Sequence, residues 1–244
     1  MNDISEVLKR LQNMLPKGVT PKFTSAGELI AWHREEERKY SDRLQREKHR
    51  IRAENVFARS GIYDRYQQCS FENYLVDHPG QQHALCLAKL WLANFDYSGA
   101  CFVFSGSVGT GKNHLASAIG NMLLKKGKTV LIITVADLMV DVGVSYYAEK
   151  NEKTLLNELC HLDLLVLDDV GVQRNTAHEF VILSQIIDRR TAMHKLVGIL
   201  TNLNEKDLSG ILRPRVMDRL MMDGGLWVNF NWKSYRSQFN RQHK

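Results

Sequence analysis

The positions of apolar and polar residues divide the chain into a short helical segment and a longer one in which strands and helices alternate. In the first segment apolar residues return every three or four positions, which predicts one amphipathic helix: Ile4, Val7, Leu8, Leu11 and Met14. Pro16 ends this pattern, and Ser25 and Glu28 then have the spacing of a capping box at the start of a second helix. We therefore expect residues 1–60 to form a small helical module.

The second predicted helix begins with Leu29, Ile30 and Trp32 and becomes densely charged after His33. Helices with so little apolar surface are weakly stable alone, so another surface must bury the apolar stripe. The module could pack on the main domain of the same chain. We favour the alternative, in which it docks onto a partner protein.

From residue 61 onward, continuous apolar runs alternate with helical patterns. Five runs predict strands, at residues 101–105, 128–135, 164–169, 196–202 and 226–230. Most of their residues are apolar on both faces, as in parallel strands covered by helices on both sides. The pattern predicts an α/β domain over residues 61–244 with a five-stranded parallel sheet and ligands at the carboxyl ends of its strands.

A glycine-rich loop follows the first of these strands and precedes an apolar helical pattern. Its sequence, Gly106-x-x-x-x-Gly111-Lys112, has the spacing of a phosphate-binding P-loop in the required strand, loop and helix context. Glycine lets the backbone turn tightly and bring N–H groups close to phosphate oxygens, and the helix N-terminus adds a positive dipole end. The residues expected to bind ATP are Gly106, Ser107, Val108, Gly109, Thr110, Gly111, Lys112, Asn113 and His114.

Polar residues at the ends of other strands add the groups that ATP hydrolysis needs. Asp168 is expected to hold Mg²⁺, directly or through water, and Asp169 to orient or deprotonate the attacking water. Asn202, at the next strand end, could bridge this water and the γ-phosphate. Asn113 stands where P-loops usually have Ser or Thr, and its amide oxygen is a second candidate ligand for Mg²⁺. Nucleotide binding is therefore better supported than efficient hydrolysis.

Arginines late in the chain could complete the site. Arg219 or Arg215 could reach the nucleotide of a neighbouring subunit, or could pair with Asp218 or Asp223 on a solvated face. Arg236 could contact the γ-phosphate in its own chain or lie in a solvated tail. With the acidic strand end, these residues favour water attack in an oligomeric ATPase over a kinase, which needs an acceptor pocket.

Composition limits the remaining classes of protein. The chain has 244 residues, of which 44% are hydrophobic and 25% charged, as in soluble globular proteins. We expect a cytoplasmic protein, because no apolar run is long enough for a membrane span and the first residues do not resemble a signal peptide. The four scattered cysteines indicate reduced thiols, not a zinc site. A net charge of +6 permits nucleic-acid contact without requiring it.

Several motifs, taken in order, resemble the DnaC family of bacterial replicative helicase loaders. They are G-x-x-G-T-G-K-N-H at the P-loop, L-L-V-L-D-D-V-G-V-Q at the third strand, and then I-L-T-N, R-V-M-D-R and W-V-x-F-N-W-x-S-Y-R-S. The pair Asn113-His114 after the P-loop lysine is typical of this family and unusual among other P-loops. The resemblance covers nearly the whole chain, including C-S-F-E-N-Y, whose aromatic residues could flank an adenine base or simply pack.

This resemblance implies an AAA+ ATPase that uses ATP and Mg²⁺ and places a hexameric DnaB-type helicase on single-stranded DNA at initiation or restart of replication. It also implies that the ATPase domains associate with one another within the helicase complex. By position, Asn202 corresponds to the sensor on the fourth strand, Arg219 to the finger that acts on a neighbour, and Arg236 to a second sensor.

The resemblance also implies two binding surfaces. The surface that faces the helicase falls on Val7, Leu8, Leu11, Met14 and Trp32. Tyr146 and Tyr147 fall in the segment where the family places an element that contacts DNA, and bases could stack on their rings. The same rings could instead pack a helix face.

Two departures from the family pattern qualify the expected activity. Asp169 stands where family members usually have Glu, so hydrolysis is expected to be slow. The chain ends 14 residues after Phe230, which is too short for a full helical lid, so a neighbouring subunit or partner is expected to enclose the nucleotide. Two alternatives stay open: an IstB-like ATPase that assists a transposase, and an adaptor switched by ATP with little hydrolysis.

Overall fold

The computed structural model describes residues 10, 25–57, 67–147, 152–172 and 177–235. Contacts group the chain into two units, residues 1–48 and 49–244. The boundary predicted at residue 60 lies outside the described residues, as does the first predicted helix except for Arg10.

Helix α2, Ala26–Phe57, confirms the second predicted helix. Its first turn is capped by Ser25, whose hydroxyl oxygen accepts a hydrogen bond from the Glu28 N–H at 3.2 Å. Exposed ion pairs follow along the helix, such as Arg38 with Glu35 at 2.9 Å, and solvent screens them strongly. Trp32 is 40% exposed, so the apolar residues of this helix keep surface that a partner could bury.

The core domain contains the predicted parallel sheet, and its strands lie within two residues of the predicted runs. They are β1 Phe102–Gly106, β2 Val130–Thr134, β3 Leu164–Val170, β4 Leu196–Thr201 and β5 Leu226–Phe230. All pairings are parallel, in the order β2-β3-β4-β1-β5. The expected fold class is therefore confirmed.

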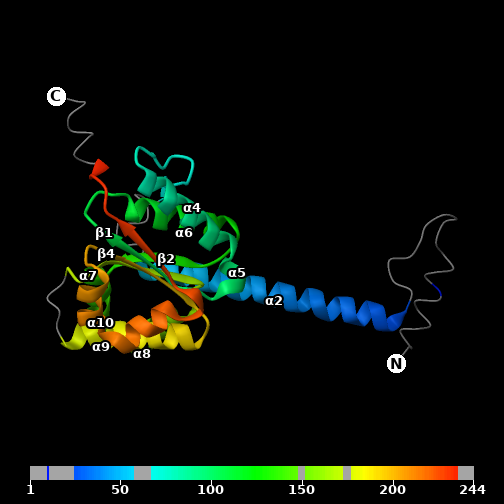
Figure 1. The fold of residues 1–244 in the computed structure, drawn as a ribbon. Coiled ribbons are helices and arrows are strands. Elements are labelled where there is room, and N and C mark those ends of the chain that lie inside the picture. Colours follow the sequence, from blue (N-terminus) through cyan, green and yellow to red (C-terminus); the bar gives the residue numbers. More distant parts are fainter. Residues whose placement is uncertain (1–9, 11–24, 58–66, 148–151, 173–176, 236–244) are drawn as a thin grey trace. The chain divides into compact units, whose positions relative to one another are not determined.

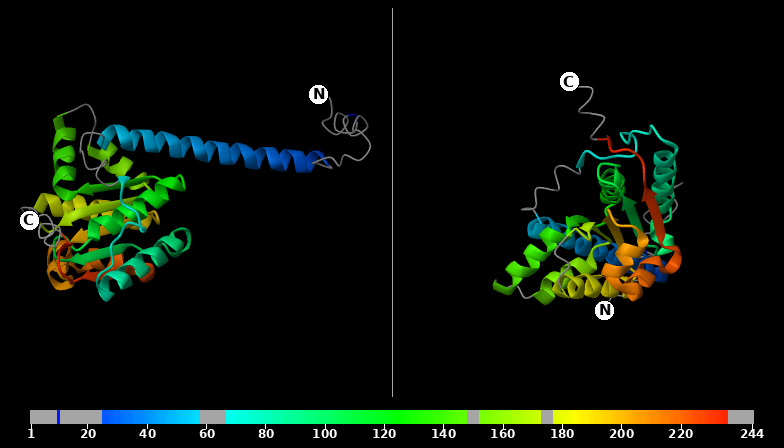
Figure 2. Two further views of the ribbon diagram at one scale, coloured as in Figure 1. Left: turned by 90° about the horizontal axis from the view of Figure 1, so that it is seen from above. Right: turned by 60° about the vertical axis from the view of Figure 1, so that its left-hand side comes forward.

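Helices cover both faces of the sheet. They are α4 Pro79–Ala93, α5 Phe95–Ser98, α6 Lys112–Lys125, α7 Val135–Tyr147, α8 Glu152–His161, α9 Ala177–Ala192 and α10 Glu205–Met221, followed by the 3₁₀ turn η1 Met222–Gly224. Figures 1 and 2 show α4 and α6 on one face and α9 and α10 on the other. Side chains alternate accordingly: Phe102 and Phe104 pack into the cluster with α4 and α6, and Val103 packs into the other.

This strand order determines which residues surround the P-loop. Strand β1 lies between β4 and β5, with Ser105 opposite Thr201 on one side and Asn229 on the other. The loop after β1 therefore has the carboxyl ends of β4 and β5 as its neighbours. The polar residues that end β3 and β4 lie at the same edge, where parallel α/β sheets bind ligands.

Helix α10 is interrupted by a kink. It begins at Glu205, where the Asn204 side chain caps it by accepting from the Asp207 N–H at 2.9 Å, and it is kinked at Arg213, whose φ is +65°. Pro214 causes the kink, because proline has no N–H to donate and clashes with the preceding turn. Within the described residues, no helix is long and apolar enough to cross a membrane.

Candidate functional site

The predicted P-loop forms a tight turn between β1 and α6. Gly106, Gly109 and Gly111 have φ values of +142°, +78° and +98°, which L-residues rarely adopt. A Cβ on Gly106 would lie 2.1 Å from the Phe230 carbonyl oxygen, and one on Gly111 would lie 2.7 Å from Tyr74 Cε2. Two of the three glycines are therefore required by space as well as by backbone conformation.

Lys112 is 6% exposed and its ammonium group is held by the loop it belongs to. Nζ donates to the carbonyl oxygens of Gly106 at 2.6 Å and Ser107 at 2.8 Å, and to Oδ1 of Asn202 at 2.9 Å. Burial lowers the pKa of Lys112, although the nearby Asp168 carboxylate opposes this shift. Phosphate oxygens can replace these neutral acceptors, and the charged acceptors would bind the ammonium more strongly.

Asn202 thus lies at the site, where its amide oxygen accepts a hydrogen bond from Lys112. The pairing of β4 with β1 explains how a residue 90 positions away reaches the lysine. Its predicted contact with the attacking water stays a prediction.

Asn113 and Asp168, both predicted as Mg²⁺ ligands, lie side by side and are joined by a hydrogen bond from Asn113 Nδ2 to Asp168 Oδ2. The other carboxylate oxygen of Asp168 accepts the Asp169 N–H at 2.8 Å. Mg²⁺ prefers oxygen ligands and usually takes several from water and phosphate, so Asp168 fits as a protein ligand. Asn113, which turns Nδ2 toward this carboxylate, would have to rotate its amide to present Oδ1 to the same ion. The described residues contain no cluster of three or more His, Cys, Asp or Glu that could hold a metal ion. Any Mg²⁺ here would depend on phosphate oxygens.

Asp169 has an unusual backbone conformation for a residue in a strand. Its φ is +56°, its side chain is exposed, and the pairing of β3 with β4 shifts register between Leu167 and Val170. Such a bulge turns consecutive side chains in different directions. The two carboxylates therefore have separate environments: Asp168 is 4% exposed while Asp169 faces solvent.

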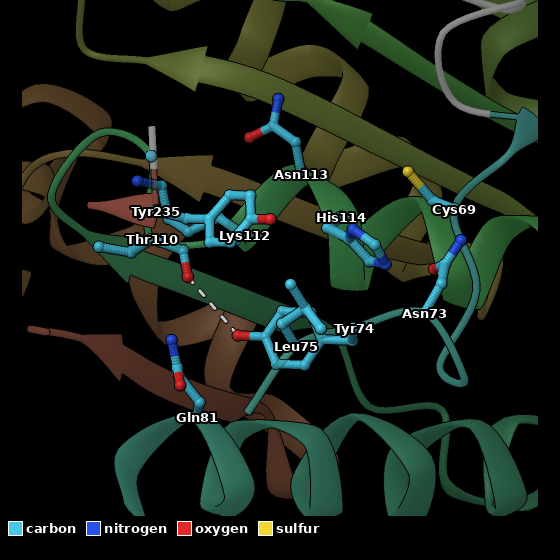
Figure 3. A pocket seen from close by; sticks show the side chains of 12 residues that line it. Cys69, Asn73, Tyr74, Leu75, Gln81, Thr110, Lys112, Asn113, His114 and Tyr235 are labelled. Atoms are coloured by element: carbon cyan, nitrogen blue, oxygen red, sulfur yellow. Dashed lines mark hydrogen bonds between the residues drawn. The ribbon is translucent and has the colours of Figure 1, made fainter. Parts of the chain in front are cut away.

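A cavity of about 360 Å³ lies beside the P-loop, and Figure 3 shows the side chains around it. Tyr74 and Tyr235 line it together with Leu75 and Gln81, so one part of the cavity is apolar and flanked by rings. Burial raises the pKa of the Tyr74 hydroxyl well above its usual range. Of the two aromatic residues predicted either to flank a base or to pack, Tyr74 lines the cavity and Phe71 packs in the core.

His114 lines the same cavity and also fastens the preceding loop. Its Nε2 lies 2.9 Å from the Ser70 carbonyl oxygen, and its ring meets Tyr74 edge to face at 5.3 Å. Two helical turns further along α6, Asn121 Nδ2 donates to the Cys69 carbonyl oxygen at 2.8 Å. His114 and Asn121 therefore hold the loop that carries Tyr74 against the helix that begins at the P-loop.

Known proteins resemble this chain over almost its full length. The model of the IstB-like ATP binding proteins matches residues 36–242. The replicative helicase loader DnaC of Escherichia coli K12 is 45% identical over 98% of both chains, and the uncharacterized protein YdaV of the same strain is 46% identical over 95% of this chain and 93% of its own. A crystal structure of the DnaC helicase loader superposes with a TM-score of 0.61 at 26% identity, over 68% of this chain and 98% of that one.

The chain belongs to the DnaC family. The family match confirms the resemblance read from the motifs and agrees with the P-loop geometry, since the matching model describes ATP-binding proteins.

The arginine assigned to a neighbour by the DnaC family motif is engaged within its own chain here. Arg219 Nη1 lies 2.6 Å from Asp188 Oδ1 on α9, so its partner is neither Asp218 nor Asp223, the two predicted alternatives. Arg215 is exposed on the same helix. The role assigned to Arg219 at a neighbouring nucleotide stays a prediction.

Other predicted residues of the DnaC family surfaces lie where side chains are not described. Val7, Leu8, Leu11, Met14 and Arg236 fall outside the described residues. Tyr146 and Tyr147 are the last two residues of α7, and only their backbone is described. Trp32 lies on α2 with exposed surface, as a docking residue requires.

Sequence reasoning missed two residues that contact the P-loop from the C-terminal side. Trp232 Nε1 donates to the Thr110 carbonyl oxygen at 2.9 Å, and the Tyr235 N–H donates to the Gly109 carbonyl oxygen at 2.9 Å. Both residues fall in the family motif W-V-x-F-N-W-x-S-Y-R-S, which identified the family but gave neither residue a role at the P-loop. That pattern does not indicate a partner 122 positions away.

Proposed function

We propose that this protein is an ATP-dependent loader of a hexameric DnaB-type replicative helicase, which it helps to place on single-stranded DNA. The observation that carries the proposal is the match to DnaC loaders over 98% of both chains, since it includes the N-terminal segment as well as the ATP-binding core. An IstB-like transposition helper would share the core, but the N-terminal match favours the loader.

The chain's own residues account for nucleotide binding. The amide N–H groups of the P-loop and the start of α6 provide an anion site, and Lys112 transfers its donors from Gly106 and Ser107 to phosphate oxygens. Mg²⁺, carried by the phosphates, would neutralise part of their charge, with Asp168 and Asn113 as its protein ligands. Tyr74 and Tyr235 would flank the base.

Slow hydrolysis is part of the proposal. The carboxylate best placed to act on water is that of Asp169, which is exposed and one methylene shorter than the family's usual Glu. We expect Asp169→Glu to raise the ATPase rate of the loader–helicase complex several-fold without changing ADP affinity, as measured by phosphate release and calorimetry. A variant that loads helicase fully while its ATPase rate stays unchanged and low would favour the adaptor alternative.

The proposed division of labour assigns residues 1–60 to the helicase and residues 61–244 to nucleotide, DNA and self-association. Trp32 supports the first assignment by its exposure within a charged helix. In the proposed assembly Arg219, which is held by Asp188 in this chain, would turn toward a neighbour's phosphate.

Size-exclusion chromatography with the host's replicative helicase tests the loader proposal. We expect full-length protein to co-elute with the helicase and Trp32→Ala to lose co-elution while keeping its melting temperature. Tyr40→Ala, which removes another exposed aromatic residue from the same helix, is the matched control. If the folded wild-type protein does not co-elute with or without ATP, the loader proposal fails.

A further inference from the structure

The last residue of β5 and the segment after it are bonded directly to the P-loop. We define the C-terminal strap as Phe230–Tyr235. Three hydrogen bonds join it to the loop: from the Ser107 N–H to the Phe230 carbonyl oxygen at 3.2 Å, from Trp232 Nε1 to the Thr110 carbonyl oxygen and from the Tyr235 N–H to the Gly109 carbonyl oxygen, the last two at 2.9 Å. Only the Trp232 bond comes from a side chain.

These bonds determine which way the peptide groups of the loop face. In a planar trans peptide, the carbonyl of one residue and the N–H of the next point in opposite directions. Holding the Thr110 carbonyl toward Trp232 therefore turns the Gly111 N–H away from the strap. The same carbonyl oxygen also accepts a hydrogen bond from the Tyr74 hydroxyl at 3.5 Å, so two donors hold this peptide and its N–H points away from both.

Most other carbonyl groups of the loop are also occupied by protein donors. Lys112 Nζ bonds those of Gly106 and Ser107, the Thr110 hydroxyl also donates to Ser107 at 2.7 Å, and the Leu115 N–H donates to Gly111 at 3.1 Å. A carbonyl oxygen turned into the cavity would repel a phosphate oxygen. The loop is thus arranged for an anion, and the strap maintains part of that arrangement.

Trp232 suits this task because its indole can donate a hydrogen bond but cannot accept one. It can therefore donate to the peptide carbonyl oxygen but cannot accept a hydrogen bond from the peptide N–H. The ring is 7% exposed and packs 4.9 Å from the Phe230 ring and 6.1 Å from the stacked His78 ring. Gly80 at the start of α4 leaves room for it, since a Cβ there would lie 2.9 Å from Trp232 Cε3.

We infer that Trp232 is a positioning residue for nucleotide binding, which keeps the Thr110–Gly111 peptide in its anion-binding orientation before the nucleotide arrives. Because its indole bonds the loop itself, its fluorescence reports nucleotide binding. This inference rests on the nucleotide-binding part of the proposed function and does not depend on helicase loading.

The test compares Trp232→Phe with Trp227→Phe in the full-length protein. The Trp232→Phe variant keeps an aromatic ring but loses the N–H donor to the loop, whereas Trp227 donates to Asn229 on β5 and not to the P-loop. We expect Trp232→Phe to weaken ADP binding by about 5- to 10-fold in calorimetry, as for one lost hydrogen bond, and Trp227→Phe to change it less than about twofold. Saturating ADP should change tryptophan emission in wild type and Trp227→Phe, but not in Trp232→Phe.

Gly80→Ala gives a second test that keeps the indole. Its Cβ would displace the ring from the α4 side, and we expect weaker ADP binding and an altered emission change. Equal ADP affinity in wild type and Trp232→Phe, or an emission change that persists without Trp232, would overturn the inference. Wild-type protein that does not bind ADP would overturn both proposals, while failed helicase co-elution with intact ADP binding would overturn only the loader proposal.

Discussion

The two ends of the sheet each hold a buried cation against backbone carbonyl groups, yet only the lysine borders the cavity beside the P-loop. At the carboxyl end, Lys112 donates to the carbonyl oxygens of Gly106 and Ser107. At the amino end, Arg190 donates to those of Leu159 at 2.5 Å and Leu196 at 2.6 Å. Burial lowers the pKa of both cations, that of Arg190 to about 10.

What differs is whether anything can replace the cation's partners. Lys112 lines a cavity of about 360 Å³, which water or phosphate can enter. Arg190 is completely buried between α8, α9 and the start of β4. The same kind of hydrogen bond therefore belongs to a ligand site at the carboxyl end and to a purely structural contact at the amino end. The difference is that a cavity adjoins Lys112, whereas Arg190 is completely buried.

Arg190→Met should have the largest effect and should act on stability alone. It leaves two enclosed carbonyl groups without donors, which we expect to cost about 3 kcal/mol of unfolding free energy, or roughly 6–12 °C in Tm. Calorimetric melting checks this, with the neighbouring Arg189→Met, which is less buried, as control. ADP affinity of the folded protein in the cold should not change. An unaltered Tm would show that Arg190 does not stabilise the fold as proposed.

Lys112→Met should produce the opposite result. We expect ATP affinity to fall roughly 30- to 100-fold, the equivalent of ~2–3 kcal/mol, because a charged donor to the phosphates is lost. The Tm without nucleotide should stay within about 2 °C, since water from the cavity can bond the loop carbonyls and the lowered pKa shows that burial disfavours the charge. Calorimetric titration and melting measure both, with the exposed Lys126→Met as control. A large loss of Tm in Lys112→Met would show that Lys112 also stabilises the fold, as Arg190 does.

Asp163, near Arg190, allows the amino end to be tested through pH. Burial disfavours its charge, but hydrogen bonds from Lys195 at 2.8 Å and Thr129 at 2.9 Å outweigh burial and lower its pKa. A lowered folded-state pKa stabilises the protein above the unfolded value of ~3.9, and the contribution disappears as pH falls through the folded value. Asp163→Asn should therefore cost ~1–2 kcal/mol in urea unfolding at about pH 7, with a gap that narrows below about pH 4. If the difference in unfolding free energy between wild type and Asp163→Asn did not change with pH, the lowered pKa of Asp163 would not contribute to stability.

His114→Ala should give the smallest effect, because it acts on the cavity only through the loop that carries Tyr74. We expect ADP affinity to fall about 2- to 5-fold, since the loop must be ordered by the nucleotide instead of by His114. Asn121→Ala, which removes the second fastening, should act in the same direction, and the exposed His161→Ala should not. Calorimetric titration distinguishes the three. No effect from either fastening would show that the loop holds itself in place.

The sheet and the P-loop could be predicted because their signals are local. Buried parallel strands are continuous apolar runs, and the run at residues 226–230 coincides with β5. Asp168 next to Asn113 also followed from the rule that polar strand ends share one edge.

Contacts set by strand order could not be predicted in this way. Periodicity does not reveal that β5 lies beside β1, and so it could not find Trp232 on the P-loop. It could not show that Arg219 pairs with Asp188 either, since that contact depends on how α10 packs on α9. Arg190 escaped notice because one arginine among apolar helix positions looks like a surface residue until its acceptors are known.

The place of β5 in the sheet has a consequence for the synthesis of the protein. The bonds that complete the P-loop span 98 positions from Ser105 to Leu203 and 122 positions from Thr110 to Trp232. A ribosome therefore releases the loop long before the strand that supports it, and such distant pairings form slowly. The nascent chain can pair strands β1 to β4 before β5 is available to complete the contacts of the P-loop. ATP can therefore bind the completed loop only after β5 and Trp232 have been translated.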